Sequence, residues 1–404
     1  MRKVIGILSM LHEPPGADSA TRLFRGKPVL AWTLSRLSRS RRLNAMAILC
    51  WDDQTPAATA VAEEHGLGIF ARGPRAALPE IESVCAARRW ADGWRGGLLS
   101  TCEFDRGFHG PWMREICGAS QADAIVAIDP AAGLVDAALI DGLIEHAQGH
   151  PQIELCFSQA APGLSGVWIS AAMLDQLVHA RSHPGKMLCY RPEMPRRDPI
   201  GTEACAPIPT PLARTTRRFT LDSQRQIHRA SVATEDLNGE LLTSQSQRLL
   251  ACFEASKVSD PLPRHVIIEL NTRRATDAIY WPGRRLGINR PDLPLEKLRP
   301  LFRELAMLDD TRITFAGVGD PLLRDDLWAI LATARNAGIN ALAVETDLFD
   351  VPPARVVELA ESAADVVCVN LPAVSAATYR AVCGVDGIDA VLSNIRTFVQ
   401  TRQK

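Results

Sequence analysis

Residues 25–34 read Arg-Gly-Lys-Pro-Val-Leu-Ala-Trp-Thr-Leu, and this stretch decides the fold of the first part of the chain. Leu30, Leu34 and Leu37 recur at intervals of three and four residues, which predicts the apolar face of a helix that begins after the proline. The apolar run at residues 4–8 precedes this helix and is typical of a buried strand. A strand followed by a helix predicts a crossover unit of a parallel sheet.

Strands and helices continue to alternate along the chain. Further strands are predicted at residues 45–50, 69–70, 123–128 and 218–221, and then at residues 265–270, 312–316, 341–345 and 365–370. The first series predicts a doubly wound, mostly parallel sheet, in which ligands bind at the carboxyl ends of the strands. The second series has four units, so it predicts an open or partial βα barrel rather than the closed barrel of eight units. The fold class is therefore α/β in both parts.

The length of 404 residues exceeds what one hydrophobic core usually serves, so we expect two domains. Pro261 and Pro263 prevent a helix from continuing and mark a linker. The predicted first domain spans residues 1–235, a helix and the linker span 236–263, and the second domain spans 264–404. The last strand of the second domain leaves an open edge. We expect the first domain, or a second copy of the chain in a homodimer, to cover that edge.

The composition excludes several classes of protein. The net charge is −1 and the isoelectric point is about 6.8, so the chain lacks the electrostatic footprint of a nucleic-acid-binding protein. No apolar run reaches the length of a membrane span. The ten cysteines include no C-x-x-C pair, which disfavours a zinc ribbon and a disulfide framework. We therefore expect a cytoplasmic protein without nucleic-acid or membrane partners.

Four segments of the first domain share a pattern with one known family. They are residues 25–34, the acidic pair Asp52 and Asp53, residues 134–141 (Leu-Val-Asp-Ala-Ala-Leu-Ile-Asp) and residues 219–222 (Phe-Thr-Leu-Asp). Together they resemble the cytidylyltransferases that activate acidic sugars, and related spore-coat-polysaccharide proteins. The resemblance covers roughly residues 2–229 and implies a nucleotide-diphospho-sugar transferase-like sheet. It also implies that Arg22, Gly26, Lys27 and Asp52 bind a nucleotide, since cations and backbone N–H groups hold phosphates.

The same resemblance implies a Mg²⁺ site. Asp222 matches the family's metal-binding aspartate. When the family's segment is aligned without gaps to residues 134–136 (Leu-Val-Asp), the family's first metal aspartate falls on Ala131, whereas an insertion of two residues puts Asp129 there. Two aspartates from different strands hold Mg²⁺ between a phosphate and its nucleophile. The alternative is that Asp129 and Asp222 only cap strand ends, where aspartates are common.

The second domain has a resemblance of its own. Residues 266–273 read Val-Ile-Ile-Glu-Leu-Asn-Thr-Arg, and with the rest of the chain from about residue 264 they resemble the first strand and frame of radical SAM enzymes. That family continues with three cysteines that hold a [4Fe–4S] cluster. The matching positions here are Arg274, Ala278 and Trp281, none of which supplies a thiolate. We therefore expect no [4Fe–4S] cluster.

A glycine-rich turn follows the second strand of this domain. Residues 315–323 (Phe-Ala-Gly-Val-Gly-Asp-Pro-Leu-Leu) look like the family's G-x-G-E-P-L-L segment. The resemblance implies a pocket at Gly317, Gly319 and Asp320 for an amine-bearing ligand such as S-adenosylmethionine. The alternative is a strand-to-helix turn, with Asp320 as N-cap and Pro321 at the first helical position.

Three functions from different classes remain open. In the first, the protein is a nucleotidyltransferase-like enzyme of a sugar or surface-polysaccharide pathway, and its barrel is a docking or regulatory appendage. In the second, both halves are non-catalytic, and this pseudoenzyme is a scaffold or regulatory protein. In the third, it is a radical SAM enzyme with unconventional ligands, although no three cysteines have a suitable spacing. The partner in the first function is a nucleotide or another small molecule.

Overall fold

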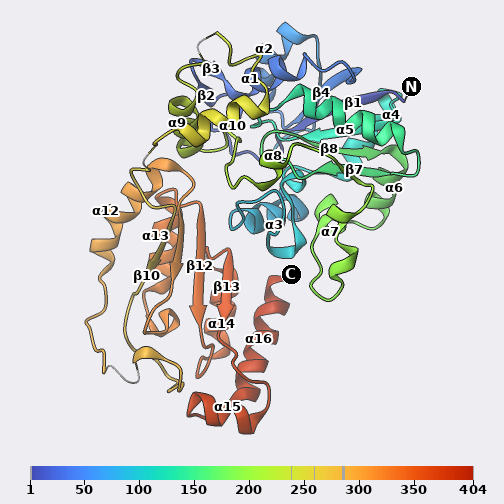
Figure 1. The fold of residues 1–404 in the computed structure, drawn as a ribbon. Helices are drawn as coiled ribbons and strands as arrows, with labels where there is room; N and C mark the ends of the chain where they lie inside the picture. Colours follow the sequence, from blue (N-terminus) through green and yellow to red (C-terminus); the bar gives the residue numbers. More distant parts are fainter. Residues whose placement is uncertain (1, 238, 259, 284–286, 404) are drawn as a thin grey trace. The chain divides into compact units, whose positions relative to one another are not determined.

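The computed structural model describes residues 2–237, 239–258, 260–283 and 287–403 (Figure 1). Contacts divide the chain into two compact units, Met1–Ser259 and Asp260–Lys404. The division falls inside the segment expected as a linker. Helix α10 (Ser246–Ala255) belongs to the first unit, because Leu249 and Leu250 pack against Phe219 in its core. The first unit therefore extends beyond the predicted boundary at residue 235.

The first unit is built on a seven-stranded sheet with the order β5-β4-β1-β6-β8-β7-β9. Its strands are β1 (Val4–Ser9), β4 (Ala45–Cys50), β5 (Gly68–Ala71), β6 (Ala124–Ile128), β7 (Leu155–Ser158), β8 (Val167–Ser170) and β9 (Cys205–Ala206). Strand β8 is antiparallel to both of its neighbours, whereas every other pair in the sheet is parallel. The sheet is thus mixed and mostly parallel, as predicted.

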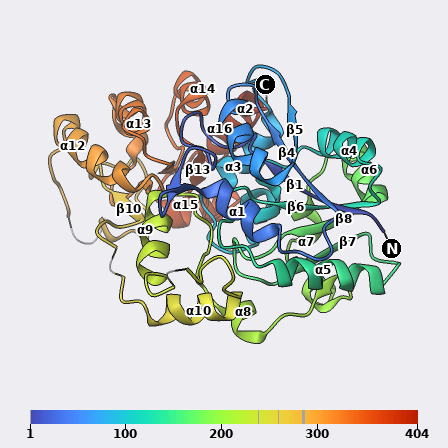
Figure 2. The ribbon, with the colours of Figure 1, turned by 90° about the horizontal axis from the view of Figure 1, so that it is seen from above.

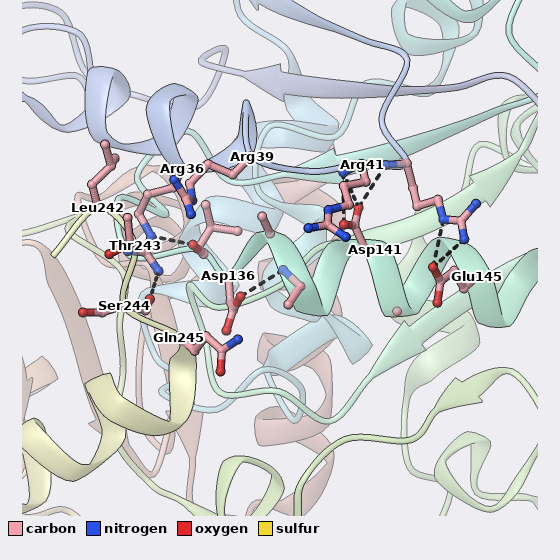
Figure 3. A pocket seen from close by; sticks show the side chains of 15 residues that line it. Arg36, Arg39, Arg41, Asp136, Asp141, Glu145, Leu242, Thr243, Ser244 and Gln245 are labelled. Carbon is pink, nitrogen blue, oxygen red and sulfur yellow. Dashed lines mark hydrogen bonds and ion pairs between the residues drawn. The ribbon is translucent and has the colours of Figure 1, made fainter. Parts of the chain in front are cut away.

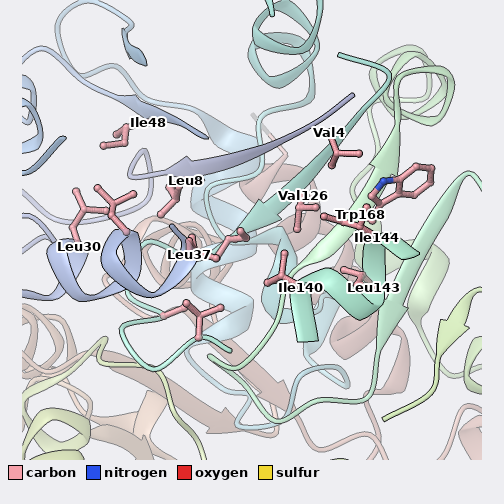
Figure 4. Close-up of a cluster of buried hydrophobic side chains, with 14 of the residues drawn as sticks. Val4, Leu8, Leu30, Leu37, Ile48, Val126, Ile140, Leu143, Ile144 and Trp168 are labelled. Carbon is pink, nitrogen blue, oxygen red and sulfur yellow. The ribbon is translucent and has the colours of Figure 1, made fainter. Parts of the chain in front are cut away.

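Helices cover both faces of this sheet. They are α1 (Val29–Leu37), α2 (Thr55–Ala62), α3 (Pro79–Arg88), α4 (Gly110–Ala119), α5 (Ala137–Gly149), α6 (Ala171–His179) and α7 (Pro184–Leu188). Helices α8 (Thr210–Arg214) and α9 (Gln224–Ala233) pack in a separate core with Phe24 and Leu134. Side chains of β1 alternate between the faces, so Leu8 packs with α1 and α5, and Ile7 packs with α4 and α6. Figure 4 shows the first of these cores, and Figure 2 shows α4 and α6 on the opposite side of the strands from α5. Two buried cores explain why the strands are apolar on both faces.

One predicted strand of the first unit is wrong. Residues 218–221 are extended but form no strand. The Phe219 N–H donates to the Pro162 carbonyl at 2.8 Å, and the Leu221 N–H donates to the Ala131 carbonyl at 2.8 Å. These bonds reach two separate loops, so the segment crosses between them instead of joining a sheet.

The stretch at residues 25–34 combines two elements. A small hairpin pairs β2 (Leu23–Phe24) with β3 (Lys27–Pro28), and α1 follows directly. Arg25 and Gly26 form the two-residue turn, with φ of 48° and 76°. Positive φ at both positions suits the tight turn of a hairpin, and glycine adopts it without steric cost.

The second unit is a four-stranded parallel sheet with the order β10-β11-β12-β13. The strands are β10 (His265–Ile268), β11 (Arg312–Phe315), β12 (Ala341–Thr346) and β13 (Val366–Val369), and the helices are α12 (Leu295–Leu305), α13 (Leu327–Asn336), α14 (Pro353–Glu361), α15 (Ala376–Cys383) and α16 (Ile388–Arg402). One face packs on helices, as when Phe315 meets Phe302 and Ile330. The four predicted strands are present, and β10 and β13 are the edges. A radical SAM-type barrel and a partner over the open edge stay predictions.

Short 3₁₀ turns connect these elements. They are η1 (Glu63–His65), η2 (Leu98–Ser100), η3 (Glu103–Asp105), η4 (Pro195–Arg197), η5 (Pro199–Gly201), η6 (Ala306–Leu308) and η7 (Pro321–Leu323). Within the described residues, no helix has both the length and the apolar character needed to cross a membrane.

Candidate functional site

The strand order of the first sheet reverses between β1 and β6. Strand β1 pairs with β4 on one side and with β6 on the other, so the two halves of the sheet wind away from this point. His12 and Glu13 follow the carboxyl end of β1, and Asp129 directly follows β6. Open α/β sheets bind ligands in the crevice at such a reversal. This end of the sheet is therefore the candidate site.

Two aspartates that were predicted as metal ligands meet here on one guanidinium group. Arg106 Nη1 lies 2.6 Å from Asp222 Oδ2 and 3.5 Å from Asp129 Oδ2. Arg218 Nη2 donates a second bond to Asp222 Oδ2 at 2.8 Å, and the Thr220 hydroxyl lies 3.1 Å from Asp222 Oδ1. The fold thus brings Asp129 and Asp222 together, as the metal-site prediction required, but an arginine lies between them.

The residues present do not fit a Mg²⁺ ion between these carboxylates. Asp129 Oδ1 accepts the Ala131 N–H at 2.8 Å, and its Oδ2 faces Arg106, so both of its oxygens are engaged. Mg²⁺ requires a near-octahedral set of oxygen ligands, and the cation that the two carboxylates share is already supplied by the chain. Among the described residues, no group of three or more His, Cys, Asp or Glu side chains has a geometry that holds a metal ion.

Burial neutralises two glutamates beside this cluster. Burial, followed by the nearby charge of Asp129, raises the pKa of Glu13 to about 8. Burial also raises the pKa of Glu103 to about 8, although the charge of Arg88 opposes the shift. Both side chains are therefore mostly protonated at neutral pH. Asp129 and Asp222 raise the pKa of Arg106 further, which outweighs its burial, so this arginine stays charged.

His12 completes the cluster as a neutral group. Burial lowers its pKa to about 4, and the charge of Arg106 adds to this effect. A general base works best with a pKa near the operating pH, so His12 is a hydrogen-bonding group rather than a base here. With His12, Glu13 and Glu103 uncharged at pH 7, the charges of Arg106 and Arg218 face those of Asp129 and Asp222.

Several polar atoms in this cluster are buried without a hydrogen-bond partner among the described residues. They include His12 Nδ1, Glu103 Oε1 and Arg88 Nε. A buried polar atom without a partner costs on the order of 1–3 kcal/mol, so such atoms usually meet a water molecule or a ligand. The cluster therefore has hydrogen-bonding capacity that the protein itself does not use.

An exposed loop at residues 14–17 borders the cluster. The Glu13 carboxyl group closes its base, because Glu13 Oε2 accepts the Ser19 N–H at 3.2 Å and pairs with the Ser19 hydroxyl at 2.9 Å. Asp18 Oδ1 then accepts the N–H groups of Ala20 and Thr21, at 3.1 and 3.0 Å. The loop is thus anchored next to β1, shortly before Arg22, Gly26 and Lys27, which the resemblance implies as nucleotide-binding residues.

The residues predicted to bind a nucleotide lie on elements around this loop. Gly26 is in the hairpin turn, and Lys27 is exposed on β3. The Arg22 carbonyl accepts the Val29 N–H at 2.8 Å, which connects the loop to the start of α1. Asp52 follows β4, and its Oδ1 accepts the Gly73 N–H at 3.1 Å. A nucleotide-binding role for these four residues stays a prediction.

Sequence reasoning missed the arginines of this site. Arg106 is 23 residues from Asp129 and 116 residues from Asp222 in sequence, so no spacing signal connects them. Arg218 lies four residues before Asp222 and was assigned to a strand. His12, Glu13 and Glu103 were also missed, and their position after β1 or in η3 is the only sequence signal that points to them.

In the second unit, another arginine stands where the resemblance expects a cluster ligand. Arg274 Nε donates to the Val318 carbonyl at 3.0 Å, and Nη1 pairs with Asp347. Its guanidinium carbon lies 3.7 Å from the centre of the Trp281 ring, whose Nε1 donates to the same Val318 carbonyl at 2.7 Å. Ala278 is 2% exposed. A stacked guanidinium and indole thus fill this place, and a [4Fe–4S] cluster does not fit it, because iron–sulfur ligation needs thiolates.

The glycine-rich turn of the second unit packs tightly against the segment that directly follows β10. A Cβ atom at Gly317, where φ is 141°, would lie 2.7 Å from the Glu269 carboxylate, and one at Gly319 would lie 2.2 Å from Asn271 Oδ1. Asp320 Oδ1 accepts the Leu322 N–H at 2.9 Å, and Oδ2 accepts the Asp347 N–H at 2.9 Å. These bonds describe an N-capped strand-to-helix turn. A ligand role for Gly317, Gly319 and Asp320 stays a prediction.

A polar groove of about 570 Å³ lies elsewhere on the first unit, between the end of α1, the start of α5 and residues 242–245 (Figure 3). Its charged groups bond largely to the protein. Arg36 Nε donates to the Val135 carbonyl at 2.6 Å, and Arg42 pairs with Glu145 at 2.7 Å. The Asp141 carboxylate accepts the backbone N–H groups of Arg41 and Arg42. We assign no ligand to this groove.

Comparison with known proteins gives similarity of structure alone. No protein-family model matches the chain, and no curated protein matches it. A cytidylyltransferase from Leptospira borgpetersenii serovar Hardjo-bovis aligns with a TM-score of 0.45 and 13% identity, over 64% of this chain and 100% of its own. CMP:2-keto-3-deoxy-manno-octonic acid synthetase complexed with CTP aligns with a TM-score of 0.30 and 8% identity, over 46% of this chain and 80% of its own. A 4-diphosphocytidyl-2C-methyl-D-erythritol synthase aligns with a TM-score of 0.31 and 14% identity, over 46% of this chain and 82% of its own. Since these TM-scores are below 0.5, the fold assignment rests on the strand order and register.

Proposed function

We propose that the first unit is a nucleotidyltransferase-like module that binds a nucleotide, or another phosphate-bearing ligand of a sugar or surface-polysaccharide pathway. The proposed site is the carboxyl end of β1 and β6. The observation that carries the proposal is the cluster around Arg106, in which His12 Nδ1 and Glu103 Oε1 are buried without a protein partner. The paired N–H donors of arginine match the oxygens of phosphate groups, and nucleotides bind α/β sheets at the point where the strand order reverses.

Calorimetry on the full chain with CTP, CMP, UTP and ATP tests this proposal. Binding of one ligand per chain supports it, and Lys27→Ala is expected to weaken that binding, because Lys27 is exposed beside the loop. Arg114→Ala is a matched control, since Arg114 is an exposed arginine on α4 that pairs with Asp175 at 2.6 Å. Absence of binding at millimolar ligand, or equal effects of the two substitutions, refutes the proposal.

A second candidate function is a non-catalytic scaffold or regulatory protein. One observation favours it: in each unit an arginine, Arg106 or Arg274, takes the place where the resemblance expects a cofactor. Release of pyrophosphate from CTP in the presence of acidic sugars separates the two candidates, because a scaffold releases none. The radical SAM function is disfavoured further, because the second unit contains two cysteines, Cys368 and Cys383, and a cluster needs three thiolates.

A further inference from the structure

Arg106 uses only part of its guanidinium group for the two aspartates. Nη1 makes both contacts, at 2.6 Å to Asp222 and 3.5 Å to Asp129. Within the part of the chain that the structure describes, Nε and Nη2 have no protein partner, and neither is among the buried atoms that lack one. The side chain is 25% exposed. Arg106 therefore has one edge bonded to carboxylates and one edge with unused N–H donors.

Asp129 and Asp222 hold the guanidinium group of Arg106 in position to bind an anionic ligand. Asp222 also pairs with Arg218 and Thr220, so it is fixed from three sides. Asp129 is fixed by the Ala131 N–H at the end of β6. A guanidinium group is planar, always charged, and presents paired N–H donors that match the oxygens of a phosphate. A positioned Arg106 thus offers the charge and the geometry that a phosphoryl group needs.

We propose that Arg106 is a built-in cation that binds a phosphoryl group of the ligand directly, without a divalent metal ion. Nη1 contacts Asp129 and Asp222, and the Nε and Nη2 edge binds the oxyanion. The identity of the ligand rests on the proposed function, but the replacement of the metal by Arg106 does not. The ligand class is a pyrophosphate-containing molecule, such as a nucleoside triphosphate.

The first half of the proposal, that Arg106 replaces the metal ion (the metal half), is tested with Mn²⁺ alone, by electron paramagnetic resonance on the full chain. Wild-type protein is expected to bind no Mn²⁺ at this site. Arg106→Ala removes the guanidinium group that lies between the two carboxylates, so it is expected to bind one Mn²⁺ at least about tenfold more tightly than wild type, since carboxylate oxygens are the ligands that such hard cations prefer. The double variant Arg106→Ala with Asp222→Asn is expected to lose that site. Arg114→Ala is the control and should behave as wild type.

One result that does not involve the Arg106 variants overturns the proposal: wild type binds one Mn²⁺ per chain, and this ion is lost in Asp129→Asn and in Asp222→Asn. This measurement does not depend on whether Arg106→Ala folds. A folded Arg106→Ala protein that gains no Mn²⁺ site also counts against it. Folding of each variant is checked by its circular dichroism and its Tm.

The second half of the proposal, that Arg106 binds a phosphoryl group directly (the ligand half), is tested by measuring the binding of pyrophosphate and of CTP. Each is measured once in the presence of EDTA and once in the presence of Mg²⁺. Equal affinity in the two conditions supports the proposal, as does a loss of about tenfold in Arg106→Lys, which keeps the charge but removes the fork. Binding that requires Mg²⁺ overturns this inference but leaves the proposed function standing. If neither ligand binds in any condition, the proposed function and the ligand half fail together, whereas the Mn²⁺ results still decide the metal half.

Discussion

Glu103 gives the first unit a stability that depends on pH. Its side chain is 8% exposed, and burial raises its pKa from 4.5 to about 8. The folded state therefore keeps a proton between pH 4.5 and 8 that the unfolded state has released. A group whose folded pKa is raised contributes stability that is complete below the unfolded pKa, and this is lost as the pH rises through the folded pKa. We expect the first unit to become less stable from neutral to mildly alkaline pH.

The magnitude follows from the size of the shift. One pKa unit corresponds to about 1.4 kcal/mol, so between pH 6.5 and 8 Glu103 alone costs about 2 kcal/mol. Glu13, whose pKa is also about 8, costs a similar amount. His12 opposes this only slightly, because its pKa falls from 6.5 to about 4, so it is neutral in the folded state and half protonated in the unfolded state at pH 6.5. Wild type should lose about 3 kcal/mol in this range, Glu103→Gln about 1.5, and the double Gln variant close to none.

Hydrogen exchange on peptides from residues 98–120, at pH 6.5, 7.2 and 8.0, measures this local stability after correction for the intrinsic exchange rate. Glu64→Gln is the control, because Glu64 is exposed in η1 and should leave the slope of wild type unchanged. A wild-type stability that does not change over this range, or a Glu103→Gln variant with the wild-type slope, would refute the assignment of a buried, protonated Glu103.

Three further predictions concern the second unit. Full-length protein reconstituted anaerobically with iron and sulfide should contain no [4Fe–4S] cluster by iron and sulfide analysis, because Arg274, Ala278 and Trp281 supply no thiolate. Arg274→Ala should lower the free energy of unfolding by about 3–5 kcal/mol in urea titrations, because it leaves the buried Asp347 carboxylate without its ion pair. Asp320→Asn should cost about 1–3 kcal/mol in the same assay, because its amide N–H₂ cannot accept the bonds from the Thr346 hydroxyl and the Asp347 N–H.

The strands that the sequence revealed are those with long apolar runs. Residues 4–8, 45–50 and 123–128 became β1, β4 and β6, because strands buried on both faces are apolar throughout. Strand β9 has two residues, Cys205 and Ala206, and carries no pattern that a window detects. The segment 218–221 resembles a strand in composition, but a strand also needs a neighbour, and the chain places loops on either side of it.

The candidate site was predictable only in part. Asp129 and Asp222 were found through the resemblance, and the fold brings them together. Arg106 was not found, because a side chain that pairs with acids far away in sequence leaves no local signal. The pKa shifts of Glu13 and Glu103 were equally hidden, since burial is a property of the packed sheet and not of the neighbouring residues.

The two arginines differ in how much of their bonding capacity the protein uses, and this difference assigns them different roles. Arg274 is engaged at every nitrogen: Nε bonds to Val318, Nη1 to Asp347, and Nη2 approaches the Gly317 and Gly319 carbonyls at 3.4 and 3.3 Å. Arg106 keeps Nε and Nη2 without a protein partner. A saturated guanidinium stabilises its surroundings and leaves nothing for a ligand, whereas an unsaturated one in a partly exposed site retains donors for an anion. We therefore expect anionic ligands to bind the first unit at Arg106, and substitutions at Arg274 to change stability without changing that binding.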